Sequence, residues 1–443
     1  MIGVVFGLWI DALPERSWWY AAVIGSGFVA VLPQKDSRWF RLVCAFITLT
    51  CVVCGTFATF TRVASATEAM QVFSGSREVE GTVFGAPIPR RTSQQVLVRL
   101  KEGETVLVSA PFLPALHHGD QISLQCRFKT LKKGDDFDLK TYLLSRDLSG
   151  WCEQEVLRGH VPFMGASLPR FLLYIRDTLH LLVERVIPPP YSTLLGGFVF
   201  GEIGVLPKTL DEELGEAGVG HMLAASGFNV SLVVTALSWV VFCVVKKPVF
   251  RYLLVLFGIL SYVWCASFTA SVLRAAVMGA LALLGSLLHR PVSGLRMLWV
   301  TVLLISVFQP LLLLHVGFQL SVSATLGLLC LSSWLERGLF WIPARFEMRA
   351  TTAATCSASI STLPVLFWHQ LPVSYLGVFA NVLWAPFIPL AMLLYPVLAG
   401  TGFLPHALTE HIGSVLQRVL NRWLWLTSEL SRLPGNGVVF SEV

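Results

Sequence analysis

Apolar segments and short polar connections alternate over most of the chain. Three apolar runs come first, at 2–10, 18–32 and 42–60, and a second series follows at 221–245, 252–268, 271–289, 297–314, 317–335, 350–369 and 374–400, with a last segment at 407–432. Several of them reach the roughly 17–25 residues that cross a bilayer as a helix. The run at 2–10 is too short to cross unaided and has no basic start, so it predicts neither a secure span nor a cleaved signal peptide.

This pattern divides the chain into four parts. We expect N-terminal transmembrane segments within 1–65, a polar insert at 76–160, an amphipathic helix at 168–187 and a transmembrane domain at 191–432. Charged residues in 168–187 mix with leucine and valine at helical spacing, which is typical of a helix lying along the membrane interface. We also expect the chain near Glu202 to be partly re-entrant.

Composition confirms the class that the pattern indicates. The chain has 443 residues, of which 54% are hydrophobic and 14% charged, and its mean hydropathy is +0.67. Soluble domains carry about 25% charged residues. We therefore expect a polytopic α-helical membrane protein.

Basic residues predict the orientation of this protein. Lysine and arginine gather in alternate connections, at 35–41, 246–251, 290–296 and 337–349, whereas the connections at 268–270, 315–316 and 370–374 have none. Cytoplasmic loops of membrane proteins carry an excess of lysine and arginine. The pattern therefore places the insert outside the cytoplasm, and the C-terminus too if the last segment crosses.

The insert has the pattern of a small β domain. Its runs at 95–100, 105–110 and 121–128 are rich in β-forming residues, and Glu102-Gly103 and His118-Gly119-Asp120 supply turns between them. Charge is nearly balanced, with twelve Lys/Arg against eleven Asp/Glu in 76–160, so the insert lacks the strong basic footprint of a nucleic-acid-binding domain. A small barrel here could shape or shield an entrance, or bind a ligand directly.

Two of the nine cysteines differ from the others in their position. Cys126 and Cys152 lie in the insert, whereas the other seven lie in or beside apolar runs. An oxidising compartment outside the cytoplasm allows a disulfide to form. We therefore predict a bond between Cys126 and Cys152.

A polar stretch at the head of an apolar run marks the first candidate site. The segment 220–230, GHMLAASGFNV, puts His221, Ser226 and Asn229 before the apolar residues 232–245. Polar side chains in a bilayer are costly unless they face protein or water, so they indicate function. The glycines of this segment permit a broken helix that lines a cavity. His221 is either a proton-relay or substrate group, or simply an interfacial residue.

Further polar residues lie within the later apolar segments. Arg274 is surrounded in sequence by Ala, Val, Leu and Met, and a guanidinium there is costly without water or an anionic partner. A phosphate backbone would be such a partner, whereas pairing with Glu202 would make Arg274 structural. Gln319 and Glu202 are further path candidates. Asn381 either lines the path or satisfies backbone groups freed by Pro386. The Ser/Thr stripe of 352, 355, 359 and 362 either lines the path or forms interhelical hydrogen bonds, and we favour the hydrogen bonds.

The second half of the chain resembles the competence domain of the ComEC family, membrane proteins implicated in drawing single-stranded DNA into bacteria. The resemblance rests on four stretches: GEIGVLPKTLDEELGEAGVGHMLAASGFNV at 201–230, SFTASVLRAAVMGALALLG at 267–285, QPLLLLHVGFQLSVSATLGLL at 309–329 and STLPVLFWHQLPVSYLGVFANVLWAPFIPL at 361–390. The insert resembles the family's extracytoplasmic β-barrel of OB type, most clearly in FDLKTYLLSRDLSGW at 137–151.

The sequence departs from the family pattern at two points. Phe228-Asn229 stands where the family usually has Leu-His, so a role that needs an imidazole there is in doubt. Many members also carry a metallo-β-lactamase-like domain, but the sequence has no His-x-His-x-Asp-His run and no Gly-x-x-x-x-Gly-Lys-Ser/Thr. We therefore expect no metal site, no cofactor, and a nuclease and a motor that are separate proteins.

These observations predict a channel, not an enzyme, in the bacterial cytoplasmic (inner) membrane, conducting single-stranded DNA into the cytoplasm during natural transformation. Its expected partners are single-stranded DNA, membrane lipid, a DNA receptor, a separate nuclease, and a cytoplasmic motor or single-strand-binding protein. One alternative is a secondary transporter of a small anionic solute that uses Arg274. Another is an intramembrane hydrolase with Ser226 as nucleophile and His221 as base, although five residues on a regular helix point about 140° apart.

Overall fold

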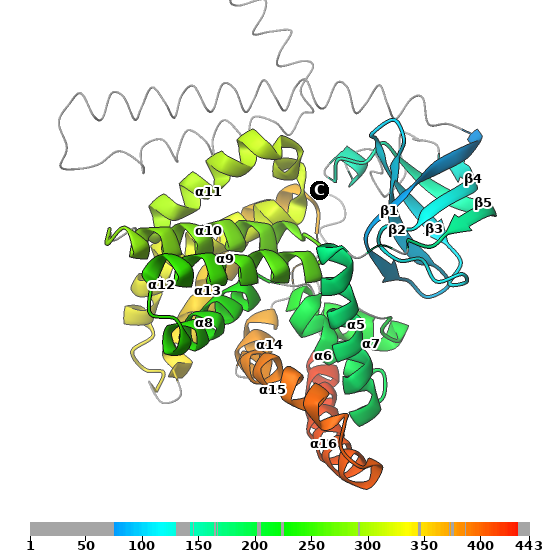
Figure 1. Ribbon diagram of the computed structural model, residues 1–443. Helices are drawn as coiled ribbons and strands as arrows, with labels where there is room; N and C mark the ends of the chain where they lie inside the picture. The colour runs from blue at the N-terminus through cyan, green and yellow to red at the C-terminus, as the bar shows by residue number, and fades with distance from the viewer. Residues whose placement is uncertain are drawn as a thin grey trace, which may run out of the picture.

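The computed structural model describes most of the chain after residue 74. The described residues are 75–129, 142–144, 146–163, 165, 167–201, 205–222, 226–290, 293–343, 347–371, 373, 376–385 and 387–432. They form a β domain at one side of a helical bundle (Figure 1). The predicted N-terminal segments within 1–65 and the side chain of Glu202 lie outside the described residues.

The β domain is built from five strands. They are β1 (Gly75–Pro89), β2 (Gln94–Leu100), β3 (Thr105–Ala110), β4 (Gln121–Phe128) and β5 (Gly150–Val161). Their pairings run β1-β2-β3-β5-β4 and return to β1, and β3 with β5 is the parallel pair. Alternate residues, such as Val96, Val98, Val106 and Val108, face a shared apolar core. The three runs predicted from the sequence correspond to β2, β3 and β4.

The helical part contains long apolar helices and shorter ones. Its elements are α5 (Leu168–Val186), α6 (Tyr191–Phe200), α7 (Lys208–Glu216), η1 (Gly220–Met222), α8 (Gly227–Val244), α9 (Pro248–Cys265), α10 (Ala270–Leu287), α11 (Gly294–Phe308), η2 (Pro310–Leu314), α12 (Val316–Gly338), α13 (Met348–Trp368), α14 (Gly377–Trp384), α15 (Phe387–Thr401) and α16 (His406–Ser431). Within the described residues, six stretches are long and apolar enough to cross a membrane: α8, α9, α10, α12, α13 and the stretch Gly377–Thr401 that α14 and α15 share.

The segment 297–314, predicted as one span, is not one helix. α11 ends at Phe308, Gln309 is extended (φ −137°, ψ 66°), and the short 3-10 helix η2 follows. Pro310 explains the break, because a proline disfavours helical geometry in the residue before it and cannot donate to the preceding turn. The fifteen residues of α11 span about 23 Å at 1.5 Å per residue, less than the hydrocarbon core of a bilayer of about 30 Å.

The last predicted segment, 407–432, forms α16, which differs from the six long apolar helices. Glu410, Arg418, Arg422 and Glu429 interrupt its apolar residues. Leu420 is fully buried, and Ile412, Leu416 and Trp423 pack partly buried against the same core as α5, α6 and α15. α16 thus has one packed face, and its exposed residues mix charged side chains with apolar ones such as Val419 and Trp425. Whether this segment crosses the membrane stays a prediction.

α5 matches the helix predicted at 168–187, but its outward face is not the polar one. Leu168, Phe171 and Tyr174 are exposed, whereas Arg176 and His180 are buried. Arg176 donates two hydrogen bonds to Asp177 Oδ1 (2.8 and 2.7 Å), and His180 Nδ1 bonds Tyr395 Oη at 2.9 Å. Arg176 Nη1 also donates to the carbonyl of Cys265 on α9 at 3.5 Å, so partners on α9 and α15 hold these two polar groups inward. The position of α5 along the membrane interface stays a prediction.

The bundle is held by two kinds of packing. α5, α6, α7, α14, α15 and α16 share one apolar core, while α8, α9 and α10 share another. α12 and α13 approach closely at Gly327, where a Cβ would lie 2.5 Å from the carbonyl oxygen of Ser357. Small residues at such crossings let membrane helices pack backbone to backbone.

The β domain rests on two connections at one end of the bundle. Leu107, Leu144 and Leu148 pack against Leu311 and Leu314 of η2. The ring of Trp264, near the end of α9, meets the rings of Phe84 and His118 edge to face at 5.7 and 5.5 Å. These connections, 266–269 and 309–315, are among those without lysine or arginine. The predicted sidedness of the insert thus agrees with its neighbours, although the membrane side itself stays a prediction.

Candidate functional site

The candidate site lies where α8 begins against α10. Ser226 is the extended N-cap residue (φ −101°, ψ 165°), and Gly227 opens the helix. A Cβ at Gly227 would lie 2.6 Å from Nη2 of Arg274 and 3.3 Å from Cβ of Ala275. A side chain at this position would displace the guanidinium of Arg274 and press on Ala275, so glycine lets α10 and its arginine approach the α8 backbone closely. The glycine predicted to permit a broken helix has this second use.

Asn229 connects α8 to the end of α6. Its side chain is 1% exposed, its Nδ2 donates to the carbonyl oxygen of Phe198 at 2.6 Å, and its Oδ1 accepts from Ser226 Oγ at 3.0 Å. Tyr262 of α9 donates its hydroxyl to the next carbonyl, that of Val199, at 2.6 Å. The last carbonyl groups of a helix lack partners within it. Asn229 and Tyr262 thus supply donors to two carbonyl groups at the end of α6. Both the amide nitrogen and the amide oxygen of Asn229 form hydrogen bonds within the protein.

Arg274 is buried in the bundle with neutral partners. It is the fifth residue of α10, so it lies about 6 Å along the helix from its start. It is 6% exposed, and its Nη1 donates to Thr325 Oγ1 of α12 and to Met278 Sδ. Its Nε has no hydrogen-bond partner. Throughout the described residues, no carboxylate forms an ion pair with it, and the predicted partner Glu202 lies outside them.

Gln319 forms hydrogen bonds between elements of the bundle. Its Nε2 donates to the carbonyl of Leu313 at 3.0 Å, and its Oε1 bonds Nε2 of His369, just after α13, at 2.8 Å. Asn381 differs, since its Oδ1 is buried and has no hydrogen-bond partner in the part of the chain that the structure describes. A role of either side chain in a transport path stays a prediction.

The hydrolase alternative receives no support from the geometry. Ser226 Oγ donates to Asn229 Oδ1, whereas His221, in η1, bonds the backbone of Gly218. The two side chains are thus each engaged elsewhere.

Three residues of the Ser/Thr stripe of α13 form hydrogen bonds within their own helix and not with a neighbouring one. Thr352, Thr355 and Thr362 donate to carbonyls of Met348, Thr351 and Ser359 on their own helix. A hydroxyl in a helix reaches the carbonyl three or four residues before it without any partner helix. The prediction was wrong for these three residues, and for Ser359 it stays a prediction.

Two contributing residues escaped the sequence analysis. Thr325 and Tyr262 each place one hydroxyl in an apolar helix, which is common in membrane bundles and carries no distinguishing pattern. A buried tyrosine does require a hydrogen-bond partner, and this was the available signal for Tyr262.

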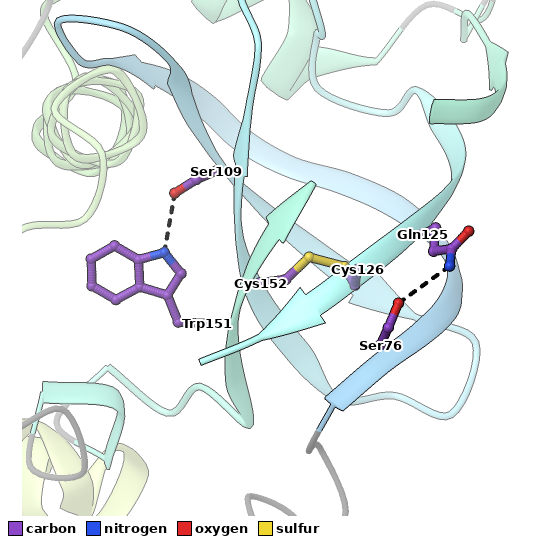
Figure 2. The surroundings of a disulfide bond; sticks show 6 residues. All are labelled: Ser76, Ser109, Gln125, Cys126, Trp151 and Cys152. Atoms are coloured by element: carbon purple, nitrogen blue, oxygen red, sulfur yellow. Dashed lines mark hydrogen bonds between the residues drawn. A yellow bond between two sulfur atoms is a disulfide. The ribbon is translucent and has the colours of Figure 1, made fainter. Parts of the chain in front are cut away.

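The β domain carries the predicted disulfide. Cys126 of β4 and Cys152 of β5 are bonded, with Cα atoms 5.4 Å apart (Figure 2). Beside it, Trp151 Nε1 donates to Ser109 Oγ at 3.1 Å and Gln125 Nε2 donates to Ser76 Oγ at 3.2 Å (Figure 2). The prediction of this bond is confirmed.

Asp120 is the buried carboxylate of the β domain. It is 1% exposed, and it accepts from His160 Nε2 (3.0 Å) and from the amides of Phe163 (3.0 Å) and His117 (2.9 Å). Burial alone raises the pKa of Asp120, but these hydrogen bonds outweigh it and hold the pKa below its ordinary value. Asp120 therefore joins the turn before β4 to the end of β5. Among the described residues, no group of three or more His, Cys, Asp or Glu could hold a metal ion.

Apolar helices of membrane-spanning length, polar side chains within them and a β domain at one end define a multi-pass helical membrane protein. The model of the Competence protein family matches residues 198–443, more than half of the chain. The chain belongs to this family, as the sequence resemblance indicated. It is similar to ComE operon protein 3 of Bacillus subtilis (strain 168), at 26% identity over 223 residues, which are 50% of this chain and 28% of that protein. The match thus spans less than a third of its relative. No solved structure matches the chain.

Proposed function

We propose that this protein is a channel that conducts single-stranded DNA across the bacterial cytoplasmic membrane during natural transformation, and that it is not an enzyme. Membership of the Competence protein family supports a role in DNA uptake. The single observation that carries the channel is Arg274, a buried cation whose described partners are all neutral. A buried charge of this kind requires an anionic or aqueous partner, and a phosphate backbone is one.

The β domain fits an entrance on the outer side. Its strand order, β1-β2-β3-β5-β4 returning to β1, is that of a five-stranded barrel of OB type, a fold that binds oligonucleotides on the face of its second and third strands. Here Leu107 on β3 packs against η2 of the bundle. We infer that the barrel shapes the entrance to the bundle, and that this face is partly occupied by the bundle itself.

Other proteins supply the remaining steps of uptake in this proposal. A receptor delivers DNA, a separate nuclease removes one strand, and a cytoplasmic motor or single-strand-binding protein draws in the other. Lipid surrounds the apolar faces of the helices, where residues such as Trp239, Phe257 and Leu393 are exposed.

Deletion of the gene and measurement of labelled DNA reaching the cytoplasm tests the function. Complementation with Arg274→Lys keeps the charge but loses the planar donor fork, so uptake should fall while membrane abundance is retained. Arg274→Gln should reduce uptake further. If Arg274 instead pairs with Glu202, both variants should be depleted from the membrane, and Arg274→Gln with Glu202→Gln should recover. Normal uptake in that double variant would remove Arg274 from the path.

One observation also favours a transporter of a small anionic solute. A helix start beside a buried arginine resembles the broken-helix sites where transporters bind anionic groups. A carrier has an occluded site for one small solute, whereas a channel for a polymer has a continuous groove. Uptake of a labelled small anion into vesicles, unaffected by single-stranded DNA, would favour the carrier.

A further inference from the structure

Within the described residues, the first turn of α8 has backbone amides without a hydrogen-bond acceptor. α8 has 18 residues, and Ser226 makes no side-chain cap to its amides, because its hydroxyl donates to Asn229 Oδ1. The amides of Gly227, Phe228 and Asn229 have no acceptor among the described residues. Such a helix start carries roughly half a positive charge and binds anions through its free N–H groups.

A second positive group lies directly beside this helix start. Arg274 is buried, with only 6% of its surface exposed. Its Nη2 lies 2.6 Å from the point where a Cβ of Gly227 would be. Its Nε is buried and unpartnered. Two like charges in contact in a poorly solvated place repel each other. A bound anion would replace this repulsion with attraction and would accept hydrogen bonds from both the amides of α8 and the guanidinium of Arg274.

The site lies at the end of the bundle that carries the β domain. Arg274 comes five residues after Thr269, and the connection 266–269 joins α10 to the end of α9, where Trp264 contacts Phe84 and His118 of the β domain. An anion passing from the β domain into the bundle would therefore meet this place early.

We propose that the start of α8 and Arg274 together bind one oxyanion of the phosphate type. The amides of Gly227 and Phe228 would donate to one or two of its oxygens, and Nε and Nη2 of Arg274 to another. Glycine at 227 keeps the guanidinium beside the helix axis. Assignment of this phosphate to the DNA backbone rests on the proposed function, whereas a lipid headgroup would offer the same chemistry.

The test uses the full chain purified into nanodiscs of phosphatidylcholine, with inorganic phosphate as the probe. Thermal unfolding is followed while phosphate replaces chloride at constant ionic strength. Binding to the folded state should raise the melting temperature in a saturable way. Arg274→Gln should require at least about tenfold more phosphate for the same shift, which is the loss expected for a charge-assisted hydrogen bond.

Arg251→Gln is the matched control. Arg251 also lies in a long apolar helix, α9, but its Nε donates to the carbonyl of Val245 and its guanidinium stacks on Phe242 at 4.2 Å. Removing this charge should leave the phosphate response unchanged. An equal loss in both variants would show only a general effect of charge and would overturn the site.

A second measurement does not depend on the stability of the Arg274 variants. Ser226→Cys places a thiol at the start of α8, and its reaction with a negatively charged methanethiosulfonate is compared with the parent chain to correct for native cysteines. Phosphate should slow this reaction. A single-stranded oligonucleotide that slows it in phosphatidylcholine identifies DNA as the source, and phosphatidylglycerol that slows it alone identifies lipid. No protection by any of the three would overturn the site.

The outcomes also separate this site from the proposed function. Phosphate binding that depends on Arg274, with normal DNA uptake by Arg274→Gln, would keep the anion site and overturn its role in DNA transport. Loss of uptake in Arg274→Gln with unchanged phosphate binding would overturn the anion site and leave the channel proposal standing.

Discussion

Replacement of Asn229 by leucine tests whether this residue joins two helices or lines a path. The amide of Asn229 donates to the carbonyl of Phe198 at 2.6 Å in a buried place. Leucine has the same branched shape and number of side-chain heavy atoms but no donor, so the carbonyl loses its partner without gaining water. An unsatisfied buried polar group costs about 1–3 kcal/mol. We expect the free energy of unfolding to fall by that amount.

Two further variants make the reasoning specific. Tyr262→Phe removes the donor to the adjacent carbonyl of Val199, so it should cost a similar amount, and the double variant should depart from additivity because both bonds hold the end of α6. Ser231→Ala is the control on the same helix, since Ser231 is exposed and bonds only the carbonyl of Gly227. It should change stability by less than about 0.5 kcal/mol.

Equilibrium unfolding in mixed micelles by titration with sodium dodecyl sulfate measures these differences. DNA uptake per folded molecule should remain close to that of the parent for Asn229→Leu. Unchanged stability of Asn229→Leu together with lost uptake would refute the structural role and restore Asn229 to the path.

Four other outcomes follow from the β domain and the bundle. Cys126 and Cys152 are 26 residues apart, so a double serine variant should lower the free energy of unfolding of the β domain by about 3–4 kcal/mol through loop entropy. Proteolysis of this variant measures the loss, and the mass shift on alkylation of the unreduced parent tests for the bond itself. Gly327→Ala forces a Cβ to within 2.5 Å of a carbonyl on α13 and should cost about 1–3 kcal/mol in micelle unfolding. The pKa of Asp120 is depressed in the folded protein, so its stabilisation is complete at neutral pH and is lost below about pH 4, and the asparagine variant should show a flatter acid unfolding curve. A reporter that is active only in the cytoplasm should stay inactive when fused after Gly150.

Each of these outcomes has a control. Alkylation of both thiols in the unreduced parent would contradict the disulfide. Gly338→Ala, where nothing lies within 4 Å of the added Cβ, should be neutral or slightly stabilising, so equal costs at both glycines would refute the packing argument. An unchanged acid dependence after the loss of Asp120 would show that other carboxylates control it. Reporter activity would overturn the assignment of sides.

The sequence determined the class of this protein because membrane insertion depends on composition over whole segments. Low charge and repeated apolar runs of bilayer length were sufficient for the multi-pass helical class, and ordered stretches such as 201–230 were sufficient for the family. The cysteine pair was also predictable, because Cys126 and Cys152 alone lay in the polar insert.

Tertiary structure decided what the polar residues do. Asn229 and Arg274 are both polar residues near the start of apolar helices, yet Asn229 meets the free carbonyls of α6 and Arg274 meets neutral groups and a helix start. Sequence gives the desolvation cost of such a group, but whether that cost is offset depends on atoms that folding brings from distant positions, such as Phe198 and Thr325. The end of α11 before Pro310 was readable from local chemistry, whereas the burial of Arg176 and His180 on α5 required partners from α9 and α15, the carbonyl of Cys265 and the hydroxyl of Tyr395.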